Sequence, residues 1–151
     1  MMRGILTGVV LALLVAPAAW AGEGLVTVKS AHDVETTADR LVAALEDKGM
    51  KVFERVDHAA GAEKAGQELG PTELVMFGNP EVGTALMRCG RTAGIDLPQK
   101  ALIWEDDDGT VFLAYNSPQY VAKRHGIEGC EDEIAKIEKA LANFARAATA
   151  E

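Results

Sequence analysis

The sequence is short of several residue types, and each shortage excludes a class of protein. Only two of its 151 residues are cysteines and 5% are aromatic, so no paired-cysteine zinc motif is present. Basic residues are also in the minority, because 15 Lys and Arg stand against 23 Asp and Glu and give a net charge of −8. An acidic chain repels the phosphate backbone, and a nucleic-acid partner is therefore not expected.

The remaining composition is that of one folded globular domain. Apolar residues make up 48% of the chain and charged residues 25%, which excludes a wholly disordered or collagen-like protein. The length suits a single hydrophobic core. The sequence contains no repeat and no internal linker, so the chain does not divide into two domains.

Residues 1–21 have the anatomy of an export signal. Arg3 supplies the positive start, an uncharged apolar run follows, and the small-x-small triplet Ala19-Trp20-Ala21 ends it. Pro17 and the shortness of the run argue against an uncleaved anchor helix. We therefore expect cleavage after Ala21, with residues 22–151 forming a single periplasmic or secreted domain that is not attached to a membrane.

Export changes the expectation for Cys89 and Cys130. Thiols outside the cytoplasm tend to be oxidised, and two cysteines allow one bridge. Closing a loop of about 42 residues would stabilise the fold by roughly 4 kcal/mol in the chain-entropy model. The alternatives are two buried free cysteines or a redox pair, although the spacing is not the short one of a redox motif. We expect a structural disulfide.

Residue patterns predict five strands and two principal helices. β-Branched and apolar runs predict the strands, and apolar residues at helical spacing predict the principal helices. An Asp-Gly turn between the last two strands is typical of a hairpin. We predict strands over 24–29, 51–57, 73–77, 100–104 and 111–115, the two principal helices over 34–45 and 134–148, and shorter helical segments over 59–69, 80–90 and 118–126. A capping box over Ser30–Asp33 starts the first principal helix. This is an α+β fold, a largely antiparallel sheet with helices on one face.

No recognised catalytic or cofactor motif is present, and no cofactor or metal is expected. The residues that could bind a ligand are polar groups at predicted strand ends: His58, Asn79, Lys100, Tyr115 and Asn116. His58 follows a strand before a small-residue segment, where side chains often line a cleft, although a hydrogen-bonded structural histidine is the simpler interpretation. His125 lies near a helix end and suits a capping role. The acidic turn Glu105–Asp108 is too short for a calcium loop.

Several motifs in order resemble one protein family. They are Phe77-Gly78-Asn79-Pro80, Asp96-Leu97-Pro98-Gln99-Lys100, Tyr115-Asn116-Ser117-Pro118 and Lys123-Arg124-His125-Gly126, with Asp57-His58 upstream. In these motifs the chain resembles the family called domain of unknown function 302. The resemblance implies a curved, largely antiparallel sheet similar to the TATA-box-binding-protein-like fold, and a possible homodimer. It implies no DNA binding and no established activity.

These observations leave four functions to weigh, of which the fourth and simplest is purely structural dimerisation. The first is an exported, non-catalytic accessory domain that binds a small ligand or an envelope protein in a cleft near the five polar residues. The second is a hydrolase-like or other enzyme, with His58 as general base and Lys100 or Tyr115 stabilising an anion. The third is a metal or haem carrier that uses His58 and His125, with Met76 or Met87 suited to copper. We favour the first, because no catalytic constellation is visible in the sequence.

Overall fold

The computed structural model describes residues 22–151, and the predicted export signal over residues 1–21 lies outside this range. Five strands form one open sheet in the order β1-β5-β4-β3-β2, and every neighbouring pair is antiparallel. The prediction of an α+β fold with an antiparallel sheet is confirmed. The strands are β1 (Leu25–Lys29), β2 (Lys51–Asp57), β3 (Thr72–Gly78), β4 (Gln99–Glu105) and β5 (Val111–Asn116).

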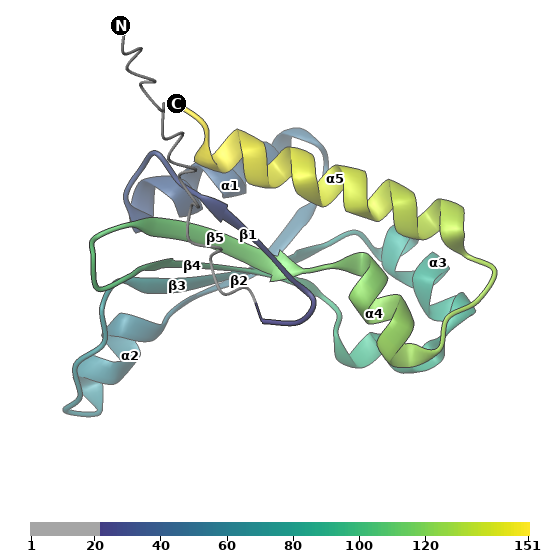
Figure 1. Cartoon of the computed structure of the whole chain (residues 1–151), viewed down its shortest axis with the longest axis horizontal. Helices are drawn as coiled ribbons and strands as arrows, with labels where there is room; N and C mark the ends of the chain where they lie inside the picture. The colour runs from purple at the N-terminus through teal and green to yellow at the C-terminus, as the bar shows by residue number, and fades with distance from the viewer. Residues whose placement is uncertain (1–21) are drawn as a thin grey trace, which may run out of the picture.

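The helices lie in three places around the sheet (Figure 1). The two long ones, α1 (Val34–Asp47) and α5 (Glu131–Thr149), pack against one face. At one end of the sheet lie α3 (Pro80–Cys89), the short 3-10 helix η1 (Arg91–Ile95) and α4 (Pro118–His125). At the other end lies α2 (His58–Lys64), which has no buried residue. The two principal helices are therefore α1 and α5, as predicted, and η1 is an element that the sequence did not reveal.

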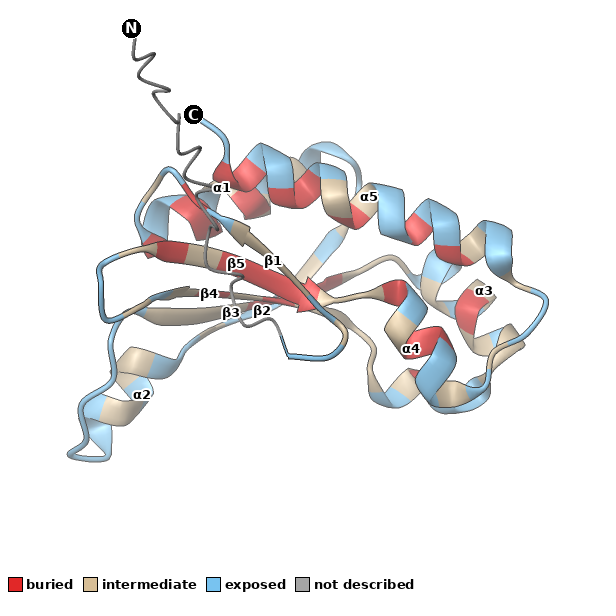
Figure 2. Ribbon diagram, viewed as in Figure 1, coloured by how far each residue is buried: buried red, intermediate tan, exposed pale blue. Residues whose placement is uncertain are grey.

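The core lies between the sheet and the two long helices. Alternate strand residues point toward the helices and are buried, as the period of two in a strand requires; they include Val75 and Phe77 on β3, Ala101 and Ile103 on β4, and Leu113 and Tyr115 on β5. Figure 2 shows the same division on α5, whose buried stripe faces the sheet. The ring of Phe77 meets that of Phe144 on α5 edge to face, with centroids 6.4 Å apart.

The N-terminus of α1 corrects the predicted capping box. Asp33, rather than Ser30, is the capping residue, and its Oδ1 accepts a hydrogen bond from the Thr36 N–H at 2.7 Å. That bond holds the pKa of the Asp33 carboxyl below its usual range. Ser30 instead is buried, with its Oγ 2.7 Å from the Thr37 hydroxyl. The last residue of the predicted box, Asp33, is therefore the residue that caps the helix.

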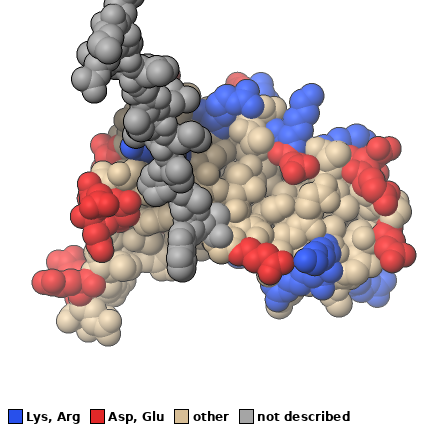
Figure 3. Space-filling model, in the orientation of Figure 1, with Lys and Arg blue, Asp and Glu red and all other residues tan. Residues whose placement is uncertain are grey.

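The β4–β5 connection is the predicted hairpin. Asp106 Oδ1 accepts hydrogen bonds from the backbone N–H groups of Asp108 and Thr110 at 3.0 and 2.8 Å. Gly109 has a φ of 77°, a conformation that glycine adopts without strain. The acidic residues of this turn lie at the same end of the molecule as α2 (Figure 3).

Candidate ligand-binding site

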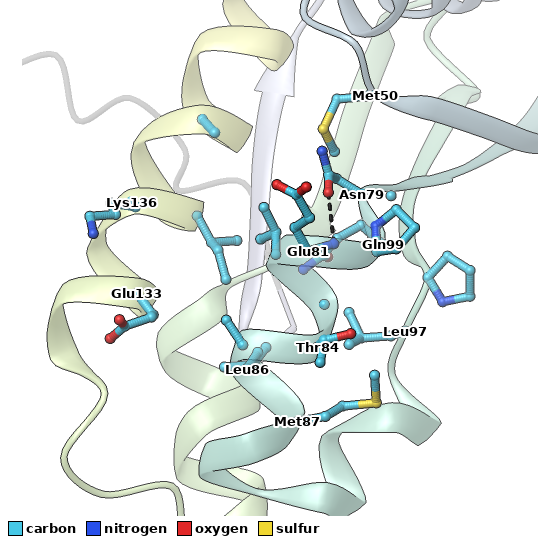
Figure 4. Close-up of a pocket in the computed structure, with 18 of the residues that line it drawn as sticks. Met50, Asn79, Glu81, Thr84, Leu86, Met87, Leu97, Gln99, Glu133 and Lys136 are labelled. Atoms are coloured by element: carbon cyan, nitrogen blue, oxygen red, sulfur yellow. Dashed lines mark hydrogen bonds between the residues drawn. The ribbon is translucent and has the colours of Figure 1, made fainter.

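A cavity of about 810 Å³ opens between α3 and α5, at the end of the sheet where β3 finishes and β4 begins. Its size falls within the usual range for small-molecule sites. The walls are mostly apolar and include residues from both helices and from the segment between η1 and β4 (Figure 4). The apolar lining side chains are Met50, Phe53, Pro80, Val82, Ala85, Leu86, Met87, Leu97, Pro98, Ile137, Ala140 and Leu141.

Local sequence explains why α3 stands as one wall. Asn79 has extended backbone and its Oδ1 accepts a hydrogen bond from the Glu81 N–H at 2.8 Å, while Pro80 occupies the first helical position. Gly83 also lines the cavity, and a Cβ added there would make an ordinary van der Waals contact with Leu97 Cδ1 at 3.7 Å. The absence of a side chain at Gly83 therefore leaves space on the cavity side of α3.

Two large apolar side chains of the lining are exposed to solvent. Phe53 is 44% exposed and Val82 is 43% exposed. The Lys51 ammonium lies 4.9 Å from the centroid of the Phe53 ring, a cation–π contact. Exposed apolar side chains that gather beside an apolar cavity are typical of a binding surface rather than of a solvated one.

Polar side chains mark one end of the cavity. Asn79 and Glu81 lie at the start of α3, and Gln99 pairs in the sheet with Phe77, two residues before Asn79. In Figure 4 these three side chains lie near Met50, whereas Leu86, Met87 and Leu97 lie toward the opposite end. The cavity therefore has a polar end and an apolar end. Glu133 and Lys136 belong to the α5 wall, across from this polar group.

Outside the cavity lining, Asp96 forms hydrogen bonds with several residues of the family motifs. Its Oδ2 lies 2.6 Å from His125 Nε2, and its Oδ1 accepts a hydrogen bond from Arg124 at 3.0 Å. Lys100 Nζ donates to the Pro98 carbonyl at 2.9 Å and reaches the Asp96 carbonyl at 3.4 Å. These contacts tie the C-terminus of α4 to the segment between η1 and β4, which carries the cavity residues Leu97 and Pro98.

The Asp96 contacts also orient the His125 ring. A carboxylate can only accept, so Nε2 carries a proton and donates to Asp96. On the other side of the ring, the Thr92 hydroxyl lies within hydrogen-bond distance of Nδ1, at 3.0 Å. The His125 side chain is only 6% exposed. This chain of hydrogen bonds fixes the segment that lines the cavity.

The predicted disulfide is present in the structure and joins the two helical walls. Cys89 is the last residue of α3, and Cys130 is the residue before α5. Their Cα atoms are 6.4 Å apart. Gly90, next to Cys89, lies against Ile127, because a Cβ added there would lie 2.6 Å from the Ile127 side chain. The bridge therefore links the C-terminus of α3 to the N-terminus of α5, although neither cysteine lines the cavity.

The structure does not bring the five predicted binding residues into one cleft. Asn79 lines the cavity, and Lys100 lies next to the lining residue Gln99. Tyr115 points into the core, where burial and then the charge of Glu138 raise its pKa, and Asn116 lies on the opposite face of the sheet because strand side chains alternate. His58 is exposed at the far end, on α2. The expectation of a single site with His58 is therefore wrong.

The histidines required by the alternative functions are also separated. His58 starts α2 and His125 ends α4, at opposite ends of the sheet (Figure 1). Within residues 22–151, no group of three or more His, Cys, Asp or Glu side chains is placed to hold a metal ion. The histidine that a carboxylate orients is His125, whereas the sequence drew attention to His58.

Sequence reasoning missed most of the cavity. Neither Met50 nor Val82, Glu81 or Lys136 was selected from the sequence for a site; Gln99 was named only within a family motif and Met87 only as a possible copper ligand. One signal was available in the sequence. Met50 and Phe53 lie at the start of β2, and α3 follows the end of β3. Antiparallel pairing brings the start of one strand and the end of the next to the same end of a sheet.

A family model, described as "Domain of unknown function DUF302", matches residues 26–144. The chain belongs to the DUF302 family. The fold agrees with a solved structure, "uncharacterized conserved protein DUF302 from Bacillus stearothermophilus", with a TM-score of 0.76. That alignment has 20% sequence identity and covers 84% of this chain and 99% of the other, so it shows a shared fold.

Two similar proteins of DUF302-like sequence carry a different name. "Fluoride-specific ion channel FluC 1" of Brucella suis biovar 1 (strain 1330) is 52% identical over 112 residues. "Fluoride-specific ion channel FluC 2" of Brucella melitensis biotype 1 (strain ATCC 23456 / CCUG 17765 / NCTC 10094 / 16M) has the same identity over the same length. Each match covers 74% of this chain but only 44% and 41% of the two relatives. Within residues 22–151, none of the helices has the length and apolar character needed to cross a bilayer.

Proposed function

We propose that this DUF302 protein is an exported, non-catalytic accessory domain that binds a small, largely apolar ligand in the cavity between α3 and α5. The observation that carries the proposal is the cavity itself, about 810 Å³ with apolar walls and a few polar groups at one end. A concave, mostly apolar site with a few polar groups is the usual form of a small-molecule binding site. Thr84 is the only hydroxyl side chain in the lining, and no base is hydrogen-bonded to it among the described residues.

Export is the second part of this proposal. The Cys89–Cys130 bridge supports it, since disulfides persist in oxidising compartments and are rare in the cytosol. We expect cell fractionation followed by mass spectrometry to find a periplasmic or secreted chain that begins at Gly22, with both cysteines oxidised. A reduced cytosolic chain that retains Met1 would contradict export. Homodimer formation stays a prediction, to be tested by light scattering on the purified protein.

Ligand binding can be tested with an uncharged fluorescent probe and a variant that fills the cavity. We expect N-phenyl-1-naphthylamine to gain fluorescence with the wild-type protein and to lose most of that gain with Ala140→Phe, which adds a ring to the α5 wall. Ala147→Phe is the matched control, because Ala147 is exposed on the same helix outside the cavity lining. Equal probe binding by both variants would place the apolar site elsewhere and overturn the proposal.

A second candidate function follows from the curated relatives. Proteins named as fluoride-specific ion channels contain a segment 52% identical to this chain that makes up less than half of their length. We propose that this domain acts beside a membrane channel of that kind. Affinity purification of the tagged protein after co-expression with a fluoride channel tests this idea. We expect the channel to co-purify, and recovery no greater than with an unrelated exported domain would exclude the association.

A further inference from the structure

The cavity also carries information about the chemistry of its ligand, provided that the proposed binding function holds. Its apolar end is lined by flexible and branched aliphatic side chains, among them Leu86, Met87 and Leu97. Methionine has three rotatable bonds and adapts to irregular shapes. Phe53 is the one aromatic residue of the lining and stands at the exposed mouth. Such walls suit a flexible hydrocarbon chain better than a flat ring system held between aromatic faces.

The polar end offers both donors and an acceptor to a ligand head group. Asn79 uses its Oδ1 to cap α3, so its Nδ2 donors remain for a ligand. Among residues 22–151, the side chains of Gln99 and Glu81 form no hydrogen bond or ion pair. Asn79 and Glu81 lie at the start of α3, directly after β3, and Gln99 is the first residue of β4, which pairs with the end of β3. A head group that both accepts and donates hydrogen bonds fits this end.

Charge then selects among possible head groups. Glu81 lies in the first turn of α3 and Glu133 in the first turn of α5. Both carboxylates therefore lie near the positive end of a helix dipole, where negative charge is favourable. Lys136 is the single cation in the lining, so the lining carries a net negative charge. An anionic head at the polar end would lie beside the Glu81 carboxylate, which is exposed to solvent, and at this short range salt screens the repulsion only in part.

From these observations we infer that the ligand is a single-chain amphiphile with a cationic or uncharged head group. The hydrocarbon chain lies toward Leu86, Met87 and Leu97. The head group lies at Asn79 and Gln99, close enough to Glu81 to interact with its carboxylate. A long-chain amine or alcohol has this chemistry, whereas a fatty acid does not.

Three probes with the same ten-carbon chain test the assignment by isothermal titration calorimetry of the whole mature chain at pH 7 and physiological salt. We expect decylamine to bind most tightly, decanol next, and decanoate at least about tenfold more weakly than decylamine. Glu81→Gln should reduce the ratio of decylamine to decanoate affinity by about threefold or more. Glu46→Gln removes a carboxylate of α1 that lies outside the cavity lining and should leave the ratio unchanged.

The outcomes separate this inference from the proposed function. If decanoate binds as tightly as decylamine, or if Glu81→Gln and Glu46→Gln change the ratio equally, the head-group assignment is overturned while the binding function stands. If none of the three probes binds while N-phenyl-1-naphthylamine does, the amphiphile assignment is overturned and the binding function stands. If neither N-phenyl-1-naphthylamine nor any of the three binds, or if Ala140→Phe binds decylamine as well as wild type does, the binding function itself fails. Loss of decylamine binding in Ala140→Phe also excludes general attraction of the amine to an acidic protein.

Discussion

Opening the Cys89–Cys130 bridge should loosen the fold and the ligand cavity together. The cysteines are 41 residues apart in the sequence, and closing a loop of this length removes about 4 kcal/mol of chain entropy from the unfolded state. For a domain of this size, 1 kcal/mol shifts the melting temperature by about 4 °C. We therefore expect the double variant Cys89→Ser/Cys130→Ser to melt about 15 °C below the oxidised wild type, as an upper figure.

The bridge also fixes the distance between α3 and α5, the two helical walls, so the double variant should bind N-phenyl-1-naphthylamine more weakly at temperatures where it is still folded. Differential scanning calorimetry and probe titration measure the two effects. Oxidised wild type treated with a dithiol reductant is the control and should behave like the variant. A variant that melts within about 2 °C of oxidised wild type would refute the loop-closure reasoning.

Three further changes should have distinct effects. Asp96→Asn keeps the shape of the side chain but removes the charge that binds Arg124 and His125. It should lower the free energy of unfolding, measured in urea, by about 1–2 kcal/mol. An unchanged urea midpoint would show that these contacts do not hold the η1–β4 segment. Gly24→Ala should lower the free energy of unfolding by more than about 2 kcal/mol, because the φ of Gly24 is 85° and the added Cβ would lie 2.1 Å from the Tyr120 ring. A soluble variant of wild-type stability would contradict this close approach. Burial raises the pKa of the Tyr115 hydroxyl above its usual value of 10.0 in the folded state, so its contribution to stability is complete below pH 10 and is lost as the pH rises through the folded-state pKa. Between pH 9 and pH 11 the melting temperature of Tyr115→Phe should therefore fall less than that of wild type. Parallel profiles of melting temperature against pH would argue against the raised pKa.

Much of the fold could be predicted because its signals are local. β-Branched runs mark the strands, the Asp-Gly turn marks the hairpin between β4 and β5, and Pro80 and Gly90 bracket α3. The sheet order could not be derived in the same way. It places β1 beside β5 at one edge, and pairing between distant segments depends on packing rather than on local preference.

The site was harder to predict, since a cavity is the space that side chains leave unfilled when the chain packs in three dimensions. Asn79 was selected as a polar residue at a strand end, and it does line the cavity. His58 was selected by the same reasoning, yet it begins a helix at the opposite end of the sheet. A polar residue at a strand end shows where a site can be, but the direction of the strand decides which end of the sheet it occupies.

The position of the first and last elements has a consequence for how the chain acquires its structure. β1 completes its hydrogen bonds only with β5, and α1 packs against α5. Arg40 of α1 donates to the carbonyls of Ala147, Ala148 and Ala150 at the very end of the chain. An N-terminal fragment emerging from the ribosome therefore lacks the partner of its first strand and one packing partner of its first helix, and cooperative folding must wait until the residues of α5 have been synthesised. A chain that stays unfolded for that long remains threadable through a narrow translocation pore.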